Sequence, residues 1–380
     1  MKILVLGAGL QGCAAAHNLL QHDPVETVTL ADLHVTRLPV FLQPYLGRRL
    51  RPVPLDASDF AGVVALMNGH DATLCALPYY FNEPMTRAAI ESGCHLCDLG
   101  GNTEIVFQQK KLHEVARSRN ISIIPDCGLA PGMVNILAAE GIRRLDRARA
   151  VRIYVGGLPQ HPEPPLNYQI VYSLEGALDY YTTPSWVLRE GKAVRVDALS
   201  ELEAQEFPAP VGVLEAFHTA GGISTMPWAF EGKIETMEYK TLRYPGHAAI
   251  MLPIRELGLI SNTPIPVKGQ QVVPRDLFIA AVQPKLYKPE GRDLVALRVV
   301  VTGEKRGGPG TVTFELLDYY DAALGISAMM RTTGFSLALT ALMQADGTIA
   351  EAGVHTPDEA VPFRAYVDGL GRFGVRVEEK

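Results

Sequence analysis

The sequence predicts an α/β fold: a doubly wound parallel sheet, followed by an α+β domain with a mixed or antiparallel sheet. Three observations support this prediction. A glycine-rich turn separates a first buried strand from a first helix, and apolar runs then alternate with helical segments up to about residue 126. Beyond residue 150 the apolar runs lengthen and are joined by hairpin-like turns. Alternating strands and helices favour parallel pairing, whereas hairpins favour antiparallel pairing.

The composition is that of an ordinary globular protein and excludes several classes of partner. The chain has 380 residues, enough for two domains, of which 47% are hydrophobic and 20% charged. A net charge of −6 without any basic block argues against a nucleic-acid partner. No apolar run reaches the ~18 residues of a membrane span. We see no signal peptide and interpret the five cysteines, including Cys94 and Cys97, as free, so we expect a cytoplasmic protein.

The first thirty-two residues contain the parts of a dinucleotide-binding unit in the required order. A strand over 1–6 leads into a G-x-G-x-x-G motif, and a helix over 13–22, a strand over 25–31 and Asp32 follow. In such a motif the first glycine allows a tight turn, the second admits the pyrophosphate and the third lets helix and strand pack closely. The pattern predicts a Rossmann fold, with a glycine turn in an unrelated α/β fold as the alternative. The expected cofactor contacts in the motif are Gly7, Gly9, Leu10, Gln11 and Gly12.

The acid at the end of the second strand predicts which dinucleotide binds. Asp32 can accept hydrogen bonds from the 2′- and 3′-hydroxyls of the adenosine ribose, and it would repel a 2′-phosphate. We therefore expect NAD rather than NADP. Arg37 is close enough to soften this preference, although it is more typical of a solvated helix position.

Further strands and helices continue the alternation. We expect strands over 50–55, 71–78, 95–102 with its loop, and 121–126, and helices over 82–92 and 104–119. Ligands bind at the carboxyl ends of such strands. Asp56 either lies beside the adenine or caps the next helix, whereas Leu77, Pro78 and Leu99 fall where the nicotinamide half passes.

The second half has a different pattern. The Gly/Pro-rich turn 127–133 opens a helix that ends near Arg144, and it either receives an anionic group or simply crosses to the next domain. We expect domain 1–127 to be completed by 326–380, with 128–325 forming a substrate-binding and dimerisation domain. Its expected strands lie at 151–155, 186–188, 193–196, 211–219, 234–244, 294–302 and 311–319, and its helices start at 173 and span 246–258 and 274–283. A long apolar helix over 327–343 and a helix-start box over 356–359 follow, and the last helix and strand should return to the first domain.

Several stretches together resemble one family. They are 7–12, 98–102, 128–132, 154–159, 164–168, 173–176, 215–219, 239–247 and 331–334. They are similar to the saccharopine dehydrogenase-like oxidoreductases, and within these to the L-lysine 6-dehydrogenases. The resemblance implies that NAD oxidises the ε-amine of L-lysine, giving 2-amino-6-oxohexanoate and ammonia, and that the aldehyde then cyclises. It also implies that the protein is a homodimer. Asn102-Thr103-Glu104 and Pro78 differ from the pattern of the lysine branch.

The implied reaction requires a proton acceptor. A lysine side-chain amine has a pKa near 10.4 in water and must lose a proton before hydride can leave the adjacent carbon. Asp98, His218 and Asp126 are the candidates, and the sequence does not choose among them. Asp98 could instead cap the loop at Gly100, and His218 could be a satisfied strand histidine.

Four residues are candidates for substrate binding. Arg243 could hold the α-carboxylate in a bidentate fork, or pair with a structural acid. His247 could bind the carboxylate, relay a proton or cap a helix. Glu175 could hold the α-ammonium or simply start a helix, and Tyr168 could line the pocket or fill core.

Other functions remain open at this point. The alternatives are saccharopine dehydrogenase or a related secondary-amine (carboxynorspermidine-type) oxidoreductase, and a non-enzymatic NAD-binding sensor. Saccharopine has three carboxylates, and Arg243 is the only clear arginine in the substrate-domain motifs, which favours the smaller substrate. The chain has no H-x-x-x-H, H-E-x-x-H or paired C-x-x-C motif, so we expect no catalytic metal.

Overall fold

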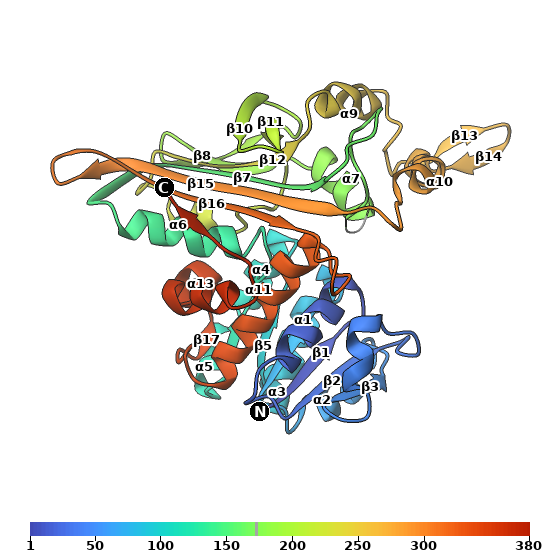
Figure 1. The fold of residues 1–380 in the computed structure, drawn as a ribbon, viewed down its shortest axis with the longest axis vertical. Helices are drawn as coiled ribbons and strands as arrows, with labels where there is room; N and C mark the ends of the chain where they lie inside the picture. The colour runs from blue at the N-terminus through green and yellow to red at the C-terminus, as the bar shows by residue number, and fades with distance from the viewer. Residues whose placement is uncertain (172–173) are drawn as a thin grey trace.

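The computed structural model describes residues 1–171 and 174–380. Two large sheets form most of the described structure, and a two-stranded hairpin is separate from both (Figure 1). A parallel sheet with helices on both faces forms one half, and the long strands of a second sheet cross over it. Residues 172 and 173, where we expected a short helix to start, lie outside the described part. The fold class predicted from the sequence is confirmed.

The first sheet is the predicted Rossmann sheet. Its order is β3-β2-β1-β4-β5-β6-β17, and every neighbouring pair is parallel. The strands are β1 (Lys2–Leu6), β2 (Thr27–Asp32), β3 (Leu50–Pro54), β4 (Ala72–Cys75), β5 (His95–Asp98), β6 (Ser122–Ile124) and β17 (Gly353–Val354). The connecting helices are α1 (Leu10–Leu20), α2 (Phe60–Met67), α3 (Asn82–Ser92), α4 (Thr103–Lys110) and α5 (His113–Ser118).

Both faces of this sheet are covered, and the central strand β1 is apolar and buried from Ile3 to Leu6. Ile3 and Val5 point into the core that contains α1, whereas Leu4 and Leu6 point into the core that contains α2 and α3. This is the side-chain alternation expected of a strand covered on both faces. The five cysteines are buried and free, as predicted.

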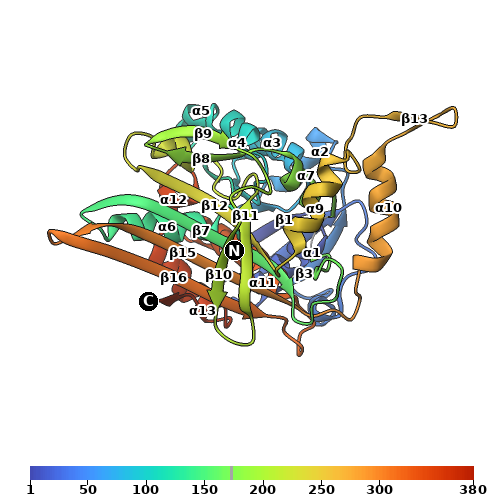
Figure 2. The same cartoon turned by 90° about the horizontal axis from the view of Figure 1, so that it is seen from above.

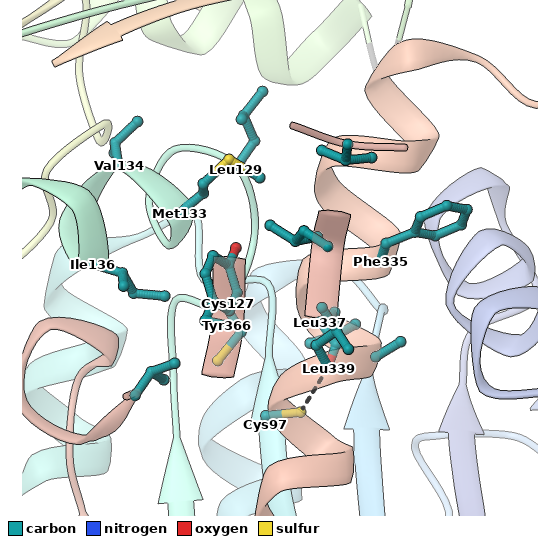
Figure 3. Close-up of a cluster of buried hydrophobic side chains, with 14 of the residues drawn as sticks. Cys97, Cys127, Leu129, Met133, Val134, Ile136, Phe335, Leu337, Leu339 and Tyr366 are labelled. Carbon is teal, nitrogen blue, oxygen red and sulfur yellow. Dashed lines mark hydrogen bonds between the residues drawn. The ribbon is translucent and has the colours of Figure 1, made fainter. Parts of the chain in front are cut away.

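The C-terminal segment covers the same sheet. Helix α11 (Ala328–Ala345) is buried along most of its length and packs on α1, β4 and β5. Figure 3 shows this packing: Leu337 and Leu339 of α11 lie near Cys97 of β5, whose thiol donates to the Leu337 carbonyl. The helix begins where Ser327 accepts a hydrogen bond from the Met330 N–H.

The end of the chain divides between the two sheets. Thr356 and Glu359 form the predicted capping box at the start of α12 (Pro357–Ala360), and α13 (Phe363–Gly371) packs on α11. Strand β18 (Glu378–Glu379) pairs with the second sheet, so the expectation that the last strand returns to the first domain is wrong. Glu379 binds Arg144 and Lys380 binds Glu315, which gives this end of the chain its ionic partners in the second domain.

The second sheet is mixed. In the described residues its order is β10-β11-β12-β7-β15-β16-β18, with the hairpin β8–β9 attached to β12, and only β12 and β7 pair in parallel. Its strands are β7 (Arg147–Pro159), β8 (Ser185–Arg189), β9 (Lys192–Val196), β10 (Glu203–Phe207), β11 (Gly212–His218), β12 (Thr236–Arg243), β15 (Asp293–Lys305) and β16 (Gly308–Tyr319). Strand β7 is much longer than the expected 151–155 because it pairs with β15 from Arg147 to Pro159.

Helices flank both faces of this sheet. Helix α6 (Met133–Arg143) lies between the two sheets and contacts β7, β15 and β16, so it joins their cores (Figure 1). The remaining helices are α7 (Leu174–Thr182), α8 (Met226–Ala229), α9 (His247–Glu256) and α10 (Pro274–Leu286). The hairpin β13 (Ile265–Val267)–β14 (Gln270–Val272) projects next to α10 (Figure 2). Among the helices described, none has both the length and the hydropathy to cross a membrane.

One predicted helix is in fact two. The expected helix 104–119 divides into α4 and α5 around Lys111 and Leu112. Helix α4 packs against α3, whereas α5 packs against β17 and β6. A single straight helix could not pack against both α3 and the strands β6 and β17. The hydrophobic periodicity of the sequence gives no information about these packing partners, so it could not predict the break.

Candidate active site

A cavity of about 340 Å³ lies between the carboxyl-end edge of the first sheet and the face of the second. We call it the reaction cavity. From the first domain it is lined by Gln11, Leu77, Tyr79, Leu99, Gly100 and Gly101, and the turn 128–131, which leads into the second domain, lines it as well. From the second domain and α11 it is lined by Val155, Gly157, Gly176, Tyr180, Thr219, Ala220, Gly222, Tyr239, Thr241, Arg243, Met329 and Thr333. A cleft between domains at this edge is the usual place for a ligand in a doubly wound sheet.

The glycine motif has the geometry that a dinucleotide requires. Gly7 has a φ of +100°, and a Cβ on Gly12 would lie 1.8 Å from the Gly7 carbonyl oxygen, so both positions need glycine. Gly9 precedes α1 with no side-chain cap, and a Cβ there would have no neighbour within 4 Å among described atoms. The N-terminal N–H groups of α1 therefore border open space, where a pyrophosphate fits.

The two side chains inside the motif face in different directions. Leu10 is 56% exposed. Gln11 lines the reaction cavity, and its buried Oε1 has no hydrogen-bond partner among the described residues. An unpaired buried amide oxygen fits a site that receives a polar ligand.

The two acids predicted for the adenosine half lie at the ends of β2 and β3. Asp32 accepts hydrogen bonds from the N–H groups of Ala8 (2.8 Å) and His34 (3.0 Å), so its carboxylate lies against the glycine turn. Asp56 is exposed and accepts from the N–H and hydroxyl of Ser58, which lower its pKa. It does not cap α2, because that role belongs to Asp59.

The nicotinamide end of the predicted cofactor path reaches the reaction cavity. Leu77 and Leu99 both line it. Pro78 does not line it but precedes the short turn Tyr79–Phe81, which brings Tyr79 into the wall.

Arg243 is the substrate candidate that the structure places in this cavity. Its side chain is buried, its guanidinium lies 4.8 Å from the centre of the Tyr168 ring, and its Nε donates to the Tyr181 hydroxyl at 3.2 Å. Nη1 donates to the Leu242 carbonyl at 2.8 Å. These contacts fix the plane of the guanidinium at the wall of the cavity.

His247 lies behind Arg243 and not in the cavity. Its Nδ1 contacts the Leu166 carbonyl oxygen at 3.0 Å, and its Nε2 contacts the Tyr181 hydroxyl at 3.0 Å. Burial, together with the nearby Arg243, lowers the pKa of His247 to about 3, so the ring is neutral. Nδ1–H therefore donates to Leu166 and Nε2 accepts from Tyr181, which leaves the tyrosine oxygen to accept from Arg243. His247 orients Tyr181 rather than capping α9 through its ring.

The other two substrate candidates lie outside the reaction cavity. Tyr168 supports the guanidinium from the far side, and burial raises the pKa of its hydroxyl to about 12. Glu175 is exposed in the first turn of α7, in agreement with the helix-start alternative.

Among the hydroxyl side chains that line the cavity, Thr219, Tyr239 and Thr241 lie together and were not predicted as site residues from the sequence. Thr219 and Thr241 are hydrogen-bonded to each other at 2.7 Å, and Thr241 lies 3.5 Å from the Tyr239 hydroxyl. Tyr239, Thr241 and Arg243 alternate along β12 and thus share one face. Side chains two positions apart on a strand point to the same face. If Arg243 had been placed in a ligand cavity, this alternation would have predicted that Thr241 and Tyr239 line it too.

Asp98 has the environment of a structural carboxylate. It is fully buried and accepts hydrogen bonds from Gly100 N–H (2.7 Å), Asn82 (3.0 Å), Gln109 (2.7 Å) and, at 3.3 Å, Asp126 N–H. Burial raises its pKa to about 6, and these donors oppose the rise. It does not line the cavity, and the geometry matches the loop-capping alternative rather than a base.

His218 also lies away from the cavity. Its Nε2 is 3.0 Å from Glu201 and its Nδ1 contacts the Tyr239 carbonyl oxygen at 3.2 Å. Glu201, His218 and Glu238 lie close enough to hold a metal, but two arginines pair with the carboxylates: Arg189 Nη2 is 2.7 Å from both, and Arg152 Nε is 3.2 Å from Glu238. Burial lowers the pKa of His218, so the structure favours the satisfied strand histidine.

A second cavity, of about 460 Å³, adjoins the first and is called here the side cavity. The two share Tyr79, Gly101, Gly176, Tyr180 and Ala220. Its other walls include Glu104, Asp179, Trp186, Arg195 and Ser224. The third acid candidate, Asp126, lines neither cavity but is buried close to both.

Two family models match the sequence and together cover nearly all of it. Residues 3–124 match the saccharopine dehydrogenase NADP binding domain, and residues 128–375 match the saccharopine dehydrogenase C-terminal domain. A saccharopine dehydrogenase (NADP+, L-glutamate-forming) of Schizosaccharomyces pombe is 22% identical, with 100% of this chain and 98% of that protein aligned. The mitochondrial alpha-aminoadipic semialdehyde synthase of Mus musculus is 25% identical over 94% of this chain, which spans 45% of its length.

Solved structures share the fold. Apo saccharopine dehydrogenase (L-Glu forming) from Saccharomyces cerevisiae superposes with a TM-score of 0.81 at 20% identity, covering 100% of this chain and 99% of that one. A homospermidine synthase from Legionella pneumophila in complex with NAD superposes with a TM-score of 0.70 at 11% identity, covering 100% and 91%. At these identities the likeness concerns the fold alone.

Proposed function

The chain belongs to the saccharopine dehydrogenase family, an oxidoreductase family with a nicotinamide-dinucleotide-binding domain, and we propose that it oxidises the ε-amine of L-lysine. NAD is the proposed acceptor, and the proposed products are 2-amino-6-oxohexanoate and ammonia. One observation carries the proposal: Arg243 is the only charged side chain among the described residues that line the reaction cavity. One fixed cation suits a substrate with one carboxylate.

Arg243 is suited to the α-carboxylate because its orientation is fixed before the substrate binds. A planar guanidinium can offer two parallel N–H donors to a carboxylate. The neutral His247–Tyr181 pair holds Nε without adding a competing negative charge.

The rest of the cavity is suited to an uncharged amine. Nicotinamide, when bound, supplies the hydride acceptor. The hydroxyls of Thr219, Thr241 and Tyr239 can hydrogen-bond the amine nitrogen, and the apolar walls favour loss of its charge. Leu77, Leu99 and Met329 are among these apolar walls.

Saccharopine is the second candidate substrate. The relatives named saccharopine dehydrogenase support it, and a structural observation does so too. Arg195 lies 4.7 Å over the Trp186 ring at the side cavity, where it could meet a further carboxylate of a longer substrate. L-lysine remains our first choice because the reaction cavity itself has one cation.

The cofactor and the assembly are also proposals. Asp32 beside the glycine turn supports NAD, since a 2′-phosphate would approach a carboxylate. The related family domain is described as NADP binding. A homodimer and a small amino-acid substrate follow from the family resemblance, and the cytoplasmic location was inferred from the sequence alone; all three stay predictions.

The proposed contact between Arg243 and the substrate α-carboxylate is tested by removing the guanidinium in one experiment and the carboxylate in another. Arg243→Gln should raise KM for L-lysine about 10- to 100-fold, because a hydrogen bond to a charged group contributes roughly 1.5–3 kcal/mol. Cadaverine is lysine without its carboxylate, so the wild type should turn it over more slowly than lysine. Arg243→Gln should change the rate with cadaverine little. Steady-state NADH formation measures both.

Arg298→Gln is the matched control. Arg298 also lies over an aromatic ring, 4.1 Å from the centre of Phe207, and belongs to the same sheet, but it lines neither cavity. It should leave the KM for lysine unchanged. An Arg243→Gln variant that weakens lysine and cadaverine equally would contradict the assignment of Arg243 to the carboxylate.

A further inference from the structure

A third cavity, of about 630 Å³, lies beyond the ends of β7 and β15 and is called here the outer cavity. Two segments of the chain, 159–169 and 288–292, form its walls. None of the described residues lines both this cavity and either of the other two. The proposed reaction makes no use of it, so its construction needs a separate explanation.

Hydrogen bonds join the two walls on both sides of the outer cavity. The Gln160 N–H donates to the Arg292 carbonyl at 2.9 Å, and the Gln160 side-chain amide donates to the Asp293 carbonyl at 2.8 Å. Farther along, the Ile170 N–H donates to the Leu286 carbonyl at 3.0 Å. Because the walls are joined on both sides, the hollow between them is formed by the fold itself, as in most ligand cavities.

Two polar side chains in the wall of the outer cavity are almost completely buried. Tyr168 is 7% exposed and Gln169 is 8% exposed. Among the described residues, neither the Tyr168 hydroxyl nor the Gln169 amide has a hydrogen-bond partner. A Cβ on Gly291 would lie 2.5 Å from Oε1 of Gln169, so glycine at this position leaves room for the amide. Buried polar groups are normally paired, so the partners of these two must come from within the cavity.

The rim of the outer cavity has two opposite charges that are not neutralised. Lys288 and Glu163 pair with each other at 2.6 Å across the two walls. Arg292 and Glu290 also line the cavity, but in the described part of the chain neither has an ion-pair partner. A molecule that binds both of them must itself have a carboxylate and an ammonium group.

One aromatic ring lies between the outer cavity and the reaction cavity. Tyr168 lines the outer cavity, and the guanidinium of Arg243, which lines the reaction cavity, is 4.8 Å from the centre of the Tyr168 ring. Leu77 and Leu99, at the nicotinamide end, line the reaction cavity and not the outer one. A molecule in the outer cavity would therefore be bound without reacting.

We propose that the outer cavity is a second binding site, which takes a free α-amino acid with a polar side chain. The carboxylate of the ligand meets Arg292, and its ammonium meets Glu290. Its side chain forms hydrogen bonds with the Tyr168 hydroxyl and the Gln169 amide, each of which can donate and accept. This site goes beyond the proposed reaction and does not depend on which amine is oxidised.

Binding is measured by isothermal titration calorimetry on the full-length protein. L-Glutamine is the probe, because its side-chain amide complements the amide of Gln169. Arg292→Gln and Glu290→Gln should each weaken binding about 10-fold or more, since each removes a charged partner. Gln169→Leu, which keeps the size of the side chain, should weaken it about threefold or more.

Two analogues of the probe test the chemical class of the ligand. N-acetyl-L-glutamine lacks the ammonium, and L-glutamine α-amide lacks the carboxylate. Each should bind the wild type at least ~10-fold more weakly than L-glutamine. Glu290→Gln should not weaken N-acetyl-L-glutamine further, because the group that Glu290 meets is already absent. Binding of N-acetyl-L-glutamine as tight as that of L-glutamine would indicate an anion site only and overturn the proposal.

Arg364→Gln is the matched control. Arg364 is an exposed arginine over an aromatic ring, 6.0 Å from the centre of Phe363, as Arg292 is over Tyr320 at 5.8 Å, but it lines none of the three cavities. This variant should bind L-glutamine as the wild type does.

Arg243→Gln distinguishes the outer cavity from the reaction cavity. It should bind L-glutamine within about threefold of the wild type, because Arg243 contacts the Tyr168 ring and not the ligand. No saturable binding by the wild type, or binding that is lost in Arg243→Gln and kept in Arg292→Gln, overturns the proposal. A protein that binds L-glutamine as described but oxidises no amine would contradict the proposed function alone.

Discussion

Acids that look alike in sequence have opposite environments in the fold. Asp98 and Asp126 both follow apolar strands, and the sequence could not choose between them. The donors that satisfy Asp98 come from Asn82 and Gln109, on two different helices, whereas no described residue donates a hydrogen bond to the carboxylate of Asp126. Which acid is satisfied depends on tertiary packing, and no local spacing contains that information.

Asp32 leads to a prediction about cofactor choice. Asp32→Asn should raise the ratio of kcat/KM for NADP to that for NAD at least ~10-fold, because the charge that meets a 2′-phosphate is removed. The amide oxygen can still accept from Ala8 N–H, so the glycine turn should keep its shape. Initial rates with both cofactors measure the ratio.

Asp59→Asn is the matched control for this change. It removes the same charge nearby and retains the cap of α2, since asparagine is also a good N-cap. A ratio that is unchanged in Asp32→Asn, or changed equally in Asp59→Asn, would contradict direct recognition of the ribose by Asp32.

At the scale of elements, the sequence predicted what is encoded locally and missed what depends on distant neighbours. Helix α3 has the predicted bounds, and the G-x-G-x-x-G turn, the long helix α11 and the capping box at Thr356 are as expected. The division between α4 and α5 and the extension of β7 follow from packing partners far along the chain. The pairing of β18 with β16 likewise depends on residues far apart in the sequence.

The glycine turn gives a prediction that separates folding from binding. Gly12→Ala should lower Tm strongly, because its Cβ would overlap the Gly7 carbonyl oxygen. Gly9→Ala should leave Tm unchanged, since its φ of −71° suits alanine and the Cβ meets no described atom within 4 Å. Gly9→Ala should instead weaken NAD binding at least ~10-fold, by occupying the space of the pyrophosphate. Thermal unfolding and a fluorescence titration with NADH measure the two effects, and normal NADH binding by Gly9→Ala would contradict the placement of the pyrophosphate.

At the scale of the molecule, the site exists only where the two sheets meet. One wall of the reaction cavity comes from the ends of β4 and β5, and the other comes from the face of β12 and β7. One hydrophobic core runs from β1 through α11 and α6 into β7 and β15, so the two walls are held together. Figure 3 shows the part of this core between α6 and α11. The sequence predicted each wall separately, but the side cavity and Ser224 had no signal because they arise only from the meeting of loops.

The central claim is that this cavity accepts a primary amine with one carboxylate. The most direct measurement is NADH formation by the purified protein with NAD and L-lysine, with ammonia quantified in parallel and saccharopine assayed alongside. The account predicts NADH and ammonia in equal amounts from lysine alone. NADH from saccharopine with release of glutamate or lysine, and none from lysine, would contradict it.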